Sequence, residues 1–258
     1  MSSISGVSGV NSYSSSPESQ IASGSKLQSA ADGAAEKAIV EKENAQVRGL
    51  DQGRRNAEDG KSLLDVADGA MSGIADNLNR IRELAVKAKN SAILSDDDIR
   101  MIQDEIDQLK QGISDIANNT EFNKKKLLDG SYEDGYIQTG ANEGQGMTLD
   151  IGAATLEALG IKDFDVTKNF SLKTIDDALA KVSSNRSVIG AQSNALDYTI
   201  AYNSLASINL TSSISNLEDA DIAKLSSELS KEKLLQSYQI MLQKKQQEQE
   251  QEKNRWFI

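Results

Sequence analysis

The sequence contains no cysteine and no histidine, and it has one proline and one tryptophan in 258 residues. The absence of cysteine excludes disulfide bonds, thiol nucleophiles and cysteine-based zinc sites. The absence of histidine removes the commonest general base and a frequent metal ligand. We therefore expect no catalytic, cofactor-binding or metal-binding residues, and the composition disfavours an enzyme.

An excess of basic residues and long apolar runs are also missing. The formal net charge of −11 disfavours nucleic-acid binding, which needs a basic surface. No window of about 20 consecutive apolar residues occurs, so we expect no membrane insertion. The first residues, MSSISGVSGVNSYSSSPESQ, lack the basic and apolar regions of a secretory signal peptide, so export would need another signal.

A seven-residue apolar repeat runs from Val47 to Asn90. One row takes every seventh position, a second row lies three residues later, and every member is apolar or small. This pattern predicts a long helix with a narrow apolar seam, as in a coiled coil. The rows are Leu50, Ala57, Leu64, Met71, Leu78 and Ala85, and Gly53, Gly60, Ala67, Ile74, Ile81 and Ala88. A bend or loop is expected near Val47–Gly53, where two glycines occur.

A second helix is predicted from about Asp97 to Asn118. Ser95 and Asp98 have the spacing of a capping box, in which each side chain satisfies the other residue's backbone amide. The acidic run Asp96–Asp98 also suggests a calcium or magnesium site, but no loop of EF-hand spacing follows it. Its apolar residues repeat as in the first helix, so we expect the two to pack antiparallel across a short loop.

The repeat returns from Thr174 in a third long helix. Its rows include the apolar seam residues Ile189, Leu196 and Ile200. Two polar residues, Arg186 and Asn203, interrupt these rows. They either fix the register and partner of the helix or mark places where the seam opens to solvent.

Between the second and third helices the pattern changes to an alternation of apolar and polar residues. Tyr136–Thr139 and Met147–Ile151 alternate in this way, with three glycines between them. This predicts a β-hairpin that lies against the helices, because an isolated two-stranded hairpin is marginally stable. The sequence Gly144-Gln145-Gly146 lacks the GK[ST] ending of a phosphate loop and is interpreted as a turn.

The predicted fold is mainly α, an elongated antiparallel coiled-coil rod with a small β-hairpin region. The segments are a disordered Ser/Gly-rich terminus at 1–24, a helical segment at 25–46, the rod at 47–217 with its hairpin at about 136–151, and a last helix with a Gln/Glu-rich tail at 218–258. From Lys244 the tail is either a solvated helix extension or disordered. Its end, Trp256-Phe257-Ile258, is either a docking peptide or a set of exposed apolar residues.

Several stretches resemble the bacterial flagellin family, in the family's order. The first is SGSKLQSAADGAAEKAI (23–39), followed by VRGLDQGRRNAEDGKSLLDVADGAM and NRIRELAVKA (79–88). Then come IQDEIDQLKQGISDIANNTEFNKKKLLDG (102–130) and the hairpin IQTGANEGQGMTLDI (137–151). The last are IDDALAKVSSNRSVIGAQSNALDYTI (175–200) and NLTSSISNLEDADIAKLSSELSK (209–231).

The resemblance implies a self-assembling structural subunit of the flagellar filament, used for motility and exported by the flagellar type III pathway. Segments 25–46 and 218–258 would then be inner-core segments, and 47–217 the outer core. The implied partners are other flagellin subunits in a homopolymer or copolymer, the export apparatus and a chaperone, and the implied location is the extracellular flagellum. No cofactor is implied.

Both ends depart from the family pattern, in the Ser/Gly-rich start and in the tail KKQQEQEQEKNRWFI. These departures leave other readings open. One is a non-polymerising or co-assembling flagellin-like paralogue, and another is a hook–filament junction protein. A third is a secreted binding or adhesive module built on the same rod.

The resemblance also implies a contact with a host Toll-like receptor. The matching residues are Arg80 and Leu84 in NRIRELAV and Glu105 in IQDEI. An arginine beside an apolar side chain on a rigid helix is typical of an interface hot spot. Leu84 lies outside both seam rows, so we expect it to face outward. The alternative is that these residues serve filament packing or a solvated face.

Overall fold

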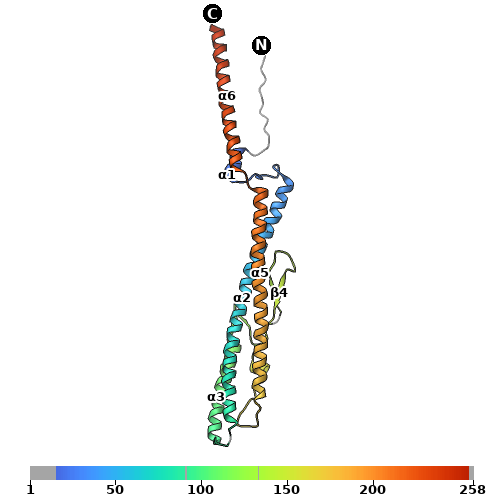
Figure 1. The fold of residues 1–258 in the computed structure, drawn as a ribbon, viewed down its shortest axis with the longest axis vertical. Coiled ribbons are helices and arrows are strands. Elements are labelled where there is room, and N and C mark those ends of the chain that lie inside the picture. Colours follow the sequence, from blue (N-terminus) through green and yellow to red (C-terminus); the bar gives the residue numbers. More distant parts are fainter. Residues whose placement is uncertain (1–15, 91, 133, 256–258) are drawn as a thin grey trace. The chain divides into compact units, whose positions relative to one another are not determined.

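A computed structural model describes residues 16–90, 92–132 and 134–255 (Figure 1). Within them the chain is mainly helical and carries two short antiparallel strand pairs, so the predicted fold class is confirmed. The helices are α1 (Pro17–Ser23), α2 (Ala34–Ala88), α3 (Asp96–Asn119), α4 (Leu156–Leu159), α5 (Lys173–Glu218) and α6 (Ile222–Arg255). The strands are β1 (Glu121–Phe122), β2 (Lys125–Lys126), β3 (Gly135–Gln138) and β4 (Gly146–Leu149). The chain divides into two compact units, Arg48–Ser207 and Met1–Val47 with Ile208–Ile258.

Helix α2 is continuous for 55 residues, so the bend predicted near Val47–Gly53 is wrong. Gly49 and Gly53 have a different role, because the hairpin backbone passes directly over them. A Cβ atom on Gly53 would lie 2.6 Å from the carbonyl carbon of Thr139, and one on Gly49 would lie 2.6 Å from the Cβ atom of Ala141. Glycine is required there for close approach of two backbones rather than for a break in the helix.

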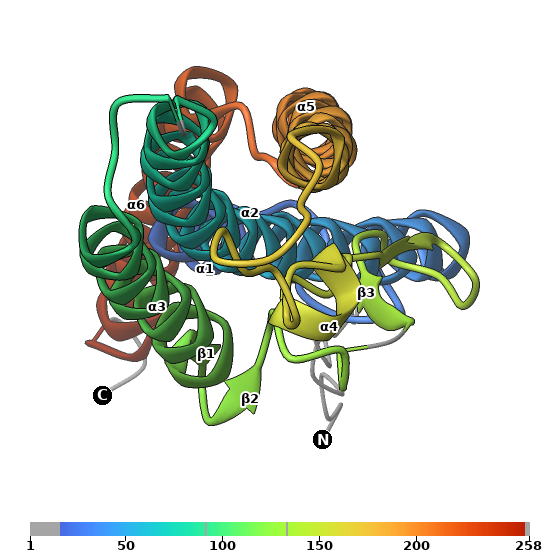
Figure 2. The same cartoon turned by 90° about the horizontal axis from the view of Figure 1, so that it is seen from below.

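In the unit Arg48–Ser207, α2 lies between α3 and α5 (Figure 2). Ion pairs between α2 and α5 run in opposite directions along the two helices, which shows that they are antiparallel. These pairs are Arg82–Asp176 at 2.6 Å, Asp68–Arg186 at 2.8 Å and Lys61–Asp197 at 2.6 Å. The α2 seam residues Leu50, Ala57, Leu64, Met71, Ile74, Leu78 and Ile81 are at most 5% exposed. On α5, Ile189 and Leu196 are buried and Ile200 is partly buried.

The two polar seam residues of α5 make specific contacts. Asn203 is buried and donates a hydrogen bond to the Thr139 carbonyl at 2.6 Å. Arg186 donates two hydrogen bonds to Asp68, at 2.8 and 3.1 Å. A misaligned pairing would leave a buried amide without its acceptor, so Asn203 favours the register interpretation over an opening to solvent.

The predicted β-hairpin is confirmed. β3 and β4 pair antiparallel, with Tyr136 opposite Thr148 and Ile137 opposite Met147. Asn56 of α2 donates to the Gln138 carbonyl at 2.8 Å, next to the carbonyl that Asn203 of α5 holds. The hairpin is therefore fastened to both long helices at the end of β3.

Helix α3 begins with the predicted capping box. The Asp98 amide donates to Ser95 Oγ at 3.2 Å, and the Ser95 amide donates to Asp98 Oδ2 at 2.9 Å. The hydrogen bonds from the Ser95 hydroxyl and backbone hold the pKa of Asp98 below its ordinary value. The sequence therefore specifies where this helix starts.

In the other unit, α1 lies within the segment 1–24 that was predicted to be disordered, so that prediction is wrong for Pro17–Ser23. Ser16 caps the helix, Pro17 has the φ angle suited to its first turn, and Gly24 ends it in a left-handed conformation. Residues 1–15 lie outside the described part of the chain.

Segments from both ends of the chain pair in this unit. The Lys26 amide donates to the Glu218 carbonyl at 2.8 Å, and the Ala220 amide donates to the Gly24 carbonyl at 2.9 Å. The Lys37 ammonium lies 3.1 Å from the Glu218 carboxylate. Helix α6 continues to Arg255, so the tail forms the helix extension; Trp256-Phe257-Ile258 lies outside the described residues.

Two glycines of α2 provide a matched test of the hairpin contact. Gly53→Ala should lower the free energy of unfolding by about 1–3 kcal/mol, because the new methyl group meets a backbone carbonyl that cannot rotate away. Gly69 is exposed with open space around it, so Gly69→Ala should raise stability by about 0.5–1 kcal/mol through helix propensity. Urea unfolding followed by circular dichroism measures both. Equal effects of the two substitutions would contradict the close contact at Gly53.

The Asp68–Arg186 pair predicts a small pH dependence. The hydrogen bonds from Arg186 lower the pKa of Asp68 below its ordinary value of 3.8. Its contribution to stability is therefore present above pH 3.8 and is lost as the pH falls through the lowered pKa. We expect Asp68→Asn to cost less than about 1 kcal/mol at pH 7, because both side chains remain more than one third exposed.

The free energies of unfolding of wild type and Asp68→Asn should converge between pH 7 and pH 2.5, as measured by chemical denaturation. Asp65→Asn, on the exposed part of the same helix, is the control. A constant difference between wild type and Asp68→Asn across this range would contradict the assignment.

Candidate functional site

The Arg80–Glu105 pair joins α2 to α3 on the surface. Arg80 donates from Nε and Nη2 to the same Glu105 oxygen, at 2.9 and 2.7 Å, and from Nη1 to Glu83 at 3.0 Å. These hydrogen bonds raise the pKa of Arg80 above its ordinary value, and those to Glu105 have the largest effect. Both side chains of the Arg80–Glu105 pair remain about half exposed, so the pair is accessible and also held in one geometry by its partners.

The expectation that Leu84 faces outward is wrong, because Leu84 is 4% exposed and belongs to the hydrophobic core. On the same face of α2, Gly73 lies near Ile116 of α3, and Arg80 contacts Glu105. Leu84 follows Arg80 by one helical turn and therefore also faces α3. A helix packed against two neighbours needs a wider apolar face than the two rows of a coiled-coil pair provide.

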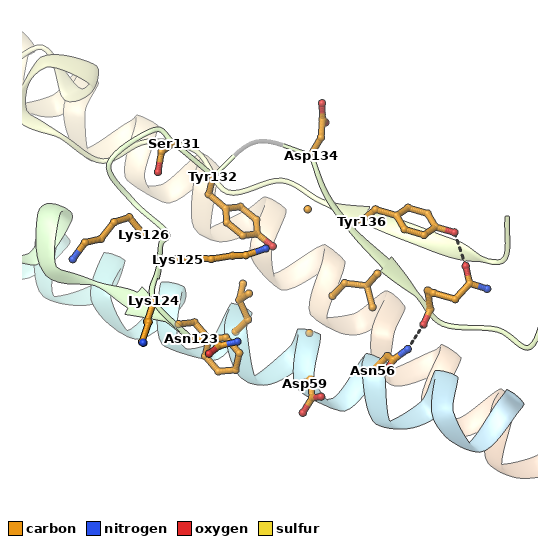
Figure 3. A pocket seen from close by; sticks show the side chains of 16 residues that line it. Asn56, Asp59, Asn123, Lys124, Lys125, Lys126, Ser131, Tyr132, Asp134 and Tyr136 are labelled. Atoms are coloured by element: carbon orange, nitrogen blue, oxygen red, sulfur yellow. Dashed lines mark hydrogen bonds between the residues drawn. The ribbon is translucent and has the colours of Figure 1, made fainter. Parts of the chain in front are cut away.

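A groove of about 800 Å³ lies between α2 and the segment from β1 to β3 (Figure 3). Its apolar part is formed by Leu63 of α2, Phe122 of β1 and Ile137 of β3, and its edges are polar. The remaining lining residues are Asn56, Asp59, Gly60, Asn123, Lys124, Lys125, Lys126, Ser131, Tyr132, Asp134, Gly135, Tyr136 and Gln138.

The β1–β2 ribbon, which forms one end of this groove, was not predicted from the sequence. Its two-residue turn, Asn123-Lys124, has φ angles of 48° and 65°. Two successive positive φ angles are typical of a type I′ hairpin turn, in which asparagine is favoured. Asn123 is the available signal, but strands of two residues are too short to show an alternating pattern.

The groove has edges of opposite charge. Lys124, Lys125 and Lys126 lie at one end, where Lys126 pairs with Glu121 at 3.0 Å. Asp59 and Asp134 lie on the other edges (Figure 3). Tyr132 reaches into the groove between them, and burial raises the pKa of its hydroxyl. This mixture favours contact with a polar protein surface over selective binding of a small ion of one sign.

The described residues contain no group of three or more carboxylates placed to hold a metal ion together. None of the helices among them combines the length and the apolar character needed to cross a bilayer.

Two family models match this chain in sequence order. The bacterial flagellin N-terminal helical region matches residues 5–133, and the bacterial flagellin C-terminal helical region matches residues 172–252. The first match includes α2, α3 and the Arg80–Glu105 pair. The second includes all of α5 and nearly all of α6.

Relatives that match over most of their length are also flagellins or flagellar filament proteins. The chain is 37% identical to a flagellin from Bacillus subtilis, over 90% of this chain and 89% of that protein. It is 38% identical to a flagellin from Halalkalibacterium halodurans, over 86% and 84%. It is 33% identical to the flagellar filament 31.3 kDa core protein of Treponema maltophilum, over 84% and 82%.

Solved structures are similar as well. The crystal structure of Bacillus cereus flagellin matches with a TM-score of 0.51 and 28% identity, over 58% of this chain and 88% of that chain. A putative flagellar hook-associated protein from Vibrio parahaemolyticus matches with a TM-score of 0.60, over 73% and 100%, but at 17% identity it supports the fold alone. With two family models in order and relatives matched over most of their length, the chain belongs to the bacterial flagellin family, the structural subunits of the flagellar filament.

Proposed function

We propose that this chain is exported from the cell and polymerises into the extracellular filament that drives motility. The observation that carries this proposal is the pairing of the two ends of the chain within one compact unit, through Lys26, Lys37 and Glu218. A subunit whose terminal segments fold together can present both of them to neighbouring subunits. The pairing residues lie inside the segments that match the family pattern, which supports this proposal.

Helix α6 supports polymerisation over a non-polymerising role. Its large apolar side chains remain exposed in the single chain, and such surfaces usually mark contacts with other proteins. The residues are Leu234, Leu235, Tyr238, Ile240, Met241 and Leu242, each at least 51% exposed. A secreted monomeric module would leave these side chains in water.

The export apparatus, a chaperone and the absence of catalysis are part of the same proposal. They rest on family membership and on a sequence with neither cysteine nor histidine. Polymerisation alone and co-assembly with another flagellin remain two versions of the function. The following experiment separates them.

We expect this chain, expressed as the sole flagellin of a flagellin-less strain, to form filaments in electron micrographs and to restore swimming in soft agar. A parallel strain that also makes its resident flagellin tests co-assembly. Filaments that contain this chain only in the second strain would establish a co-assembling subunit. Secreted monomer in both strains would contradict the proposal.

We also propose that a host Toll-like receptor contacts the exposed edge between α2 and α3. Arg80 and Glu105 support this proposal, because they are half exposed and held together on two packed helices. An arginine fixed in one rotamer loses little entropy on binding, which favours a hot-spot role. Leu84 is buried, so it supports the surface from beneath.

Arg80→Ala should reduce activation of a receptor reporter cell by monomeric protein at least about tenfold, the effect expected for a hot-spot residue. Arg82→Ala is a matched control, because Arg82 also forms a half-exposed ion pair across two helices, with Asp176 of α5. It should change the half-maximal dose by less than about twofold, as expected for exposed pairs outside an interface. Equal losses for both variants would contradict a specific contact at Arg80.

A further inference from the structure

One long part of α5 is nearly free of charge. Between Arg186 and Glu218 its only Asp, Glu, Lys or Arg is Asp197, in a chain of which 26% is charged. Asp197 forms an ion pair with Lys61 of α2 at 2.6 Å, so its negative charge is balanced within the subunit. A solvated helix face normally carries charged residues, and this one does not.

Three large side chains are exposed in line on this part of α5. Tyr198 is 79% exposed, Tyr202 is 68% exposed and Leu205 is 60% exposed. Val188 and Ile208 are also exposed, but they lie out of line with these three. Spacings of four and three residues place them on one side of the helix, which we call the α5 outer face. This side is opposite Leu196, which packs into the α2 seam. Small, uncharged residues are exposed around them: Ser187, Gly190, Ala191, Asn194, Ala195 and Ala201. Val188 and the paired Asp197 are exposed at the edges of this side.

This composition is that of a protein interface. Interface centres are depleted of charged residues and enriched in tyrosine, whose ring supplies apolar area while its hydroxyl forms hydrogen bonds at the rim. A single exposed tyrosine needs no explanation. Three large side chains in line, with small uncharged neighbours, form a continuous surface on which another backbone can approach closely.

The net charge of −11 indicates which partner fits. Two copies of an acidic chain repel each other, so they approach at lowest electrostatic cost through surfaces without carboxylates. The exposed sides of the neighbouring helices carry such groups, among them Asp59 and Asp65 on α2 and Asp97 and Glu105 on α3. The α5 outer face has none.

We propose that the α5 outer face, formed by Tyr198, Tyr202 and Leu205, packs against a second copy of this chain in the filament. The proposal rests on the polymerisation proposed above. A contact between two identical faces would close a dimer and stop growth, whereas a filament requires an open, head-to-tail type of contact. The face therefore meets a different surface of the second copy.

The absence of cysteine allows a direct test. Tyr202→Cys and Ser204→Cys each place a single thiol on α5; Ser204 is exposed but lies on another side of the helix. The rate of maleimide labelling is measured on monomer and on assembled filaments. At position 202 the rate should fall at least about tenfold on assembly, as expected for a site buried in an interface core. At position 204 it should change by less than about twofold.

A second measurement uses charge. Tyr198→Glu and Tyr202→Glu should raise the monomer concentration needed for assembly at least about tenfold, because a carboxylate would be buried against an acidic neighbour. Ser204→Glu adds the same charge elsewhere on α5 and should have little effect. Circular dichroism of the monomers checks that each variant folds, and where a glutamate variant fails to fold, the thiol protection decides.

The outcomes separate the two proposals. Filaments in which the thiol at position 202 reacts as fast as in the monomer would overturn the α5 contact and leave polymerisation standing. A wild-type chain that forms no filament, alone or with another flagellin, would overturn both. Protection at position 202 with free reaction at position 204 would support both.

Discussion

Close antiparallel packing of α2 on α5 is the interaction on which the unit Arg48–Ser207 depends. It buries the apolar rows of both helices, and among the described residues of this unit no other pair of elements is as long. The hairpin can reach both helices only because Gly53 leaves room for the Thr139 carbonyl. Asn203 then holds that same carbonyl by a buried hydrogen bond. One register of the two helices therefore also fixes the position of the hairpin.

Charge is distributed so that packing and assembly use different sides of the helices. The ion pairs Lys61–Asp197 and Arg82–Asp176 lie at the edges of the α2–α5 contact, and their side chains are about one third to one half exposed. Such pairs contribute little stability, but they disfavour other registers, which would bring like charges together. The apolar rows lie between them, and the uncharged α5 outer face lies beyond them. An acidic subunit can thus be well folded and still offer a surface to its own copies.

The wrong predictions for Leu84 and for the glycines of α2 have a common physical cause. The heptad pattern describes a helix with one partner, so it assigned Leu84 to the outside and gave no reason for glycines in mid-helix. Both features depend on further elements, α3 at Leu84 and the hairpin at Gly53. The β1–β2 ribbon was missed because its strands have two residues each. The groove it helps to form therefore could not be predicted.

By itself the sequence determined the long helices, the capping box at Ser95 and the β-hairpin, because periodicity, caps and turns are local signals. It also indicated the family, through the resemblance of several stretches in order. Only the tertiary structure decided which side of each helix is covered. Burial of Leu84, the acceptor of Asn203 and the exposure of Tyr202 depend on neighbours far away in the sequence. The same apolar residue types occur in the seam and on the α5 outer face. What distinguishes them is whether another helix of the same chain covers them.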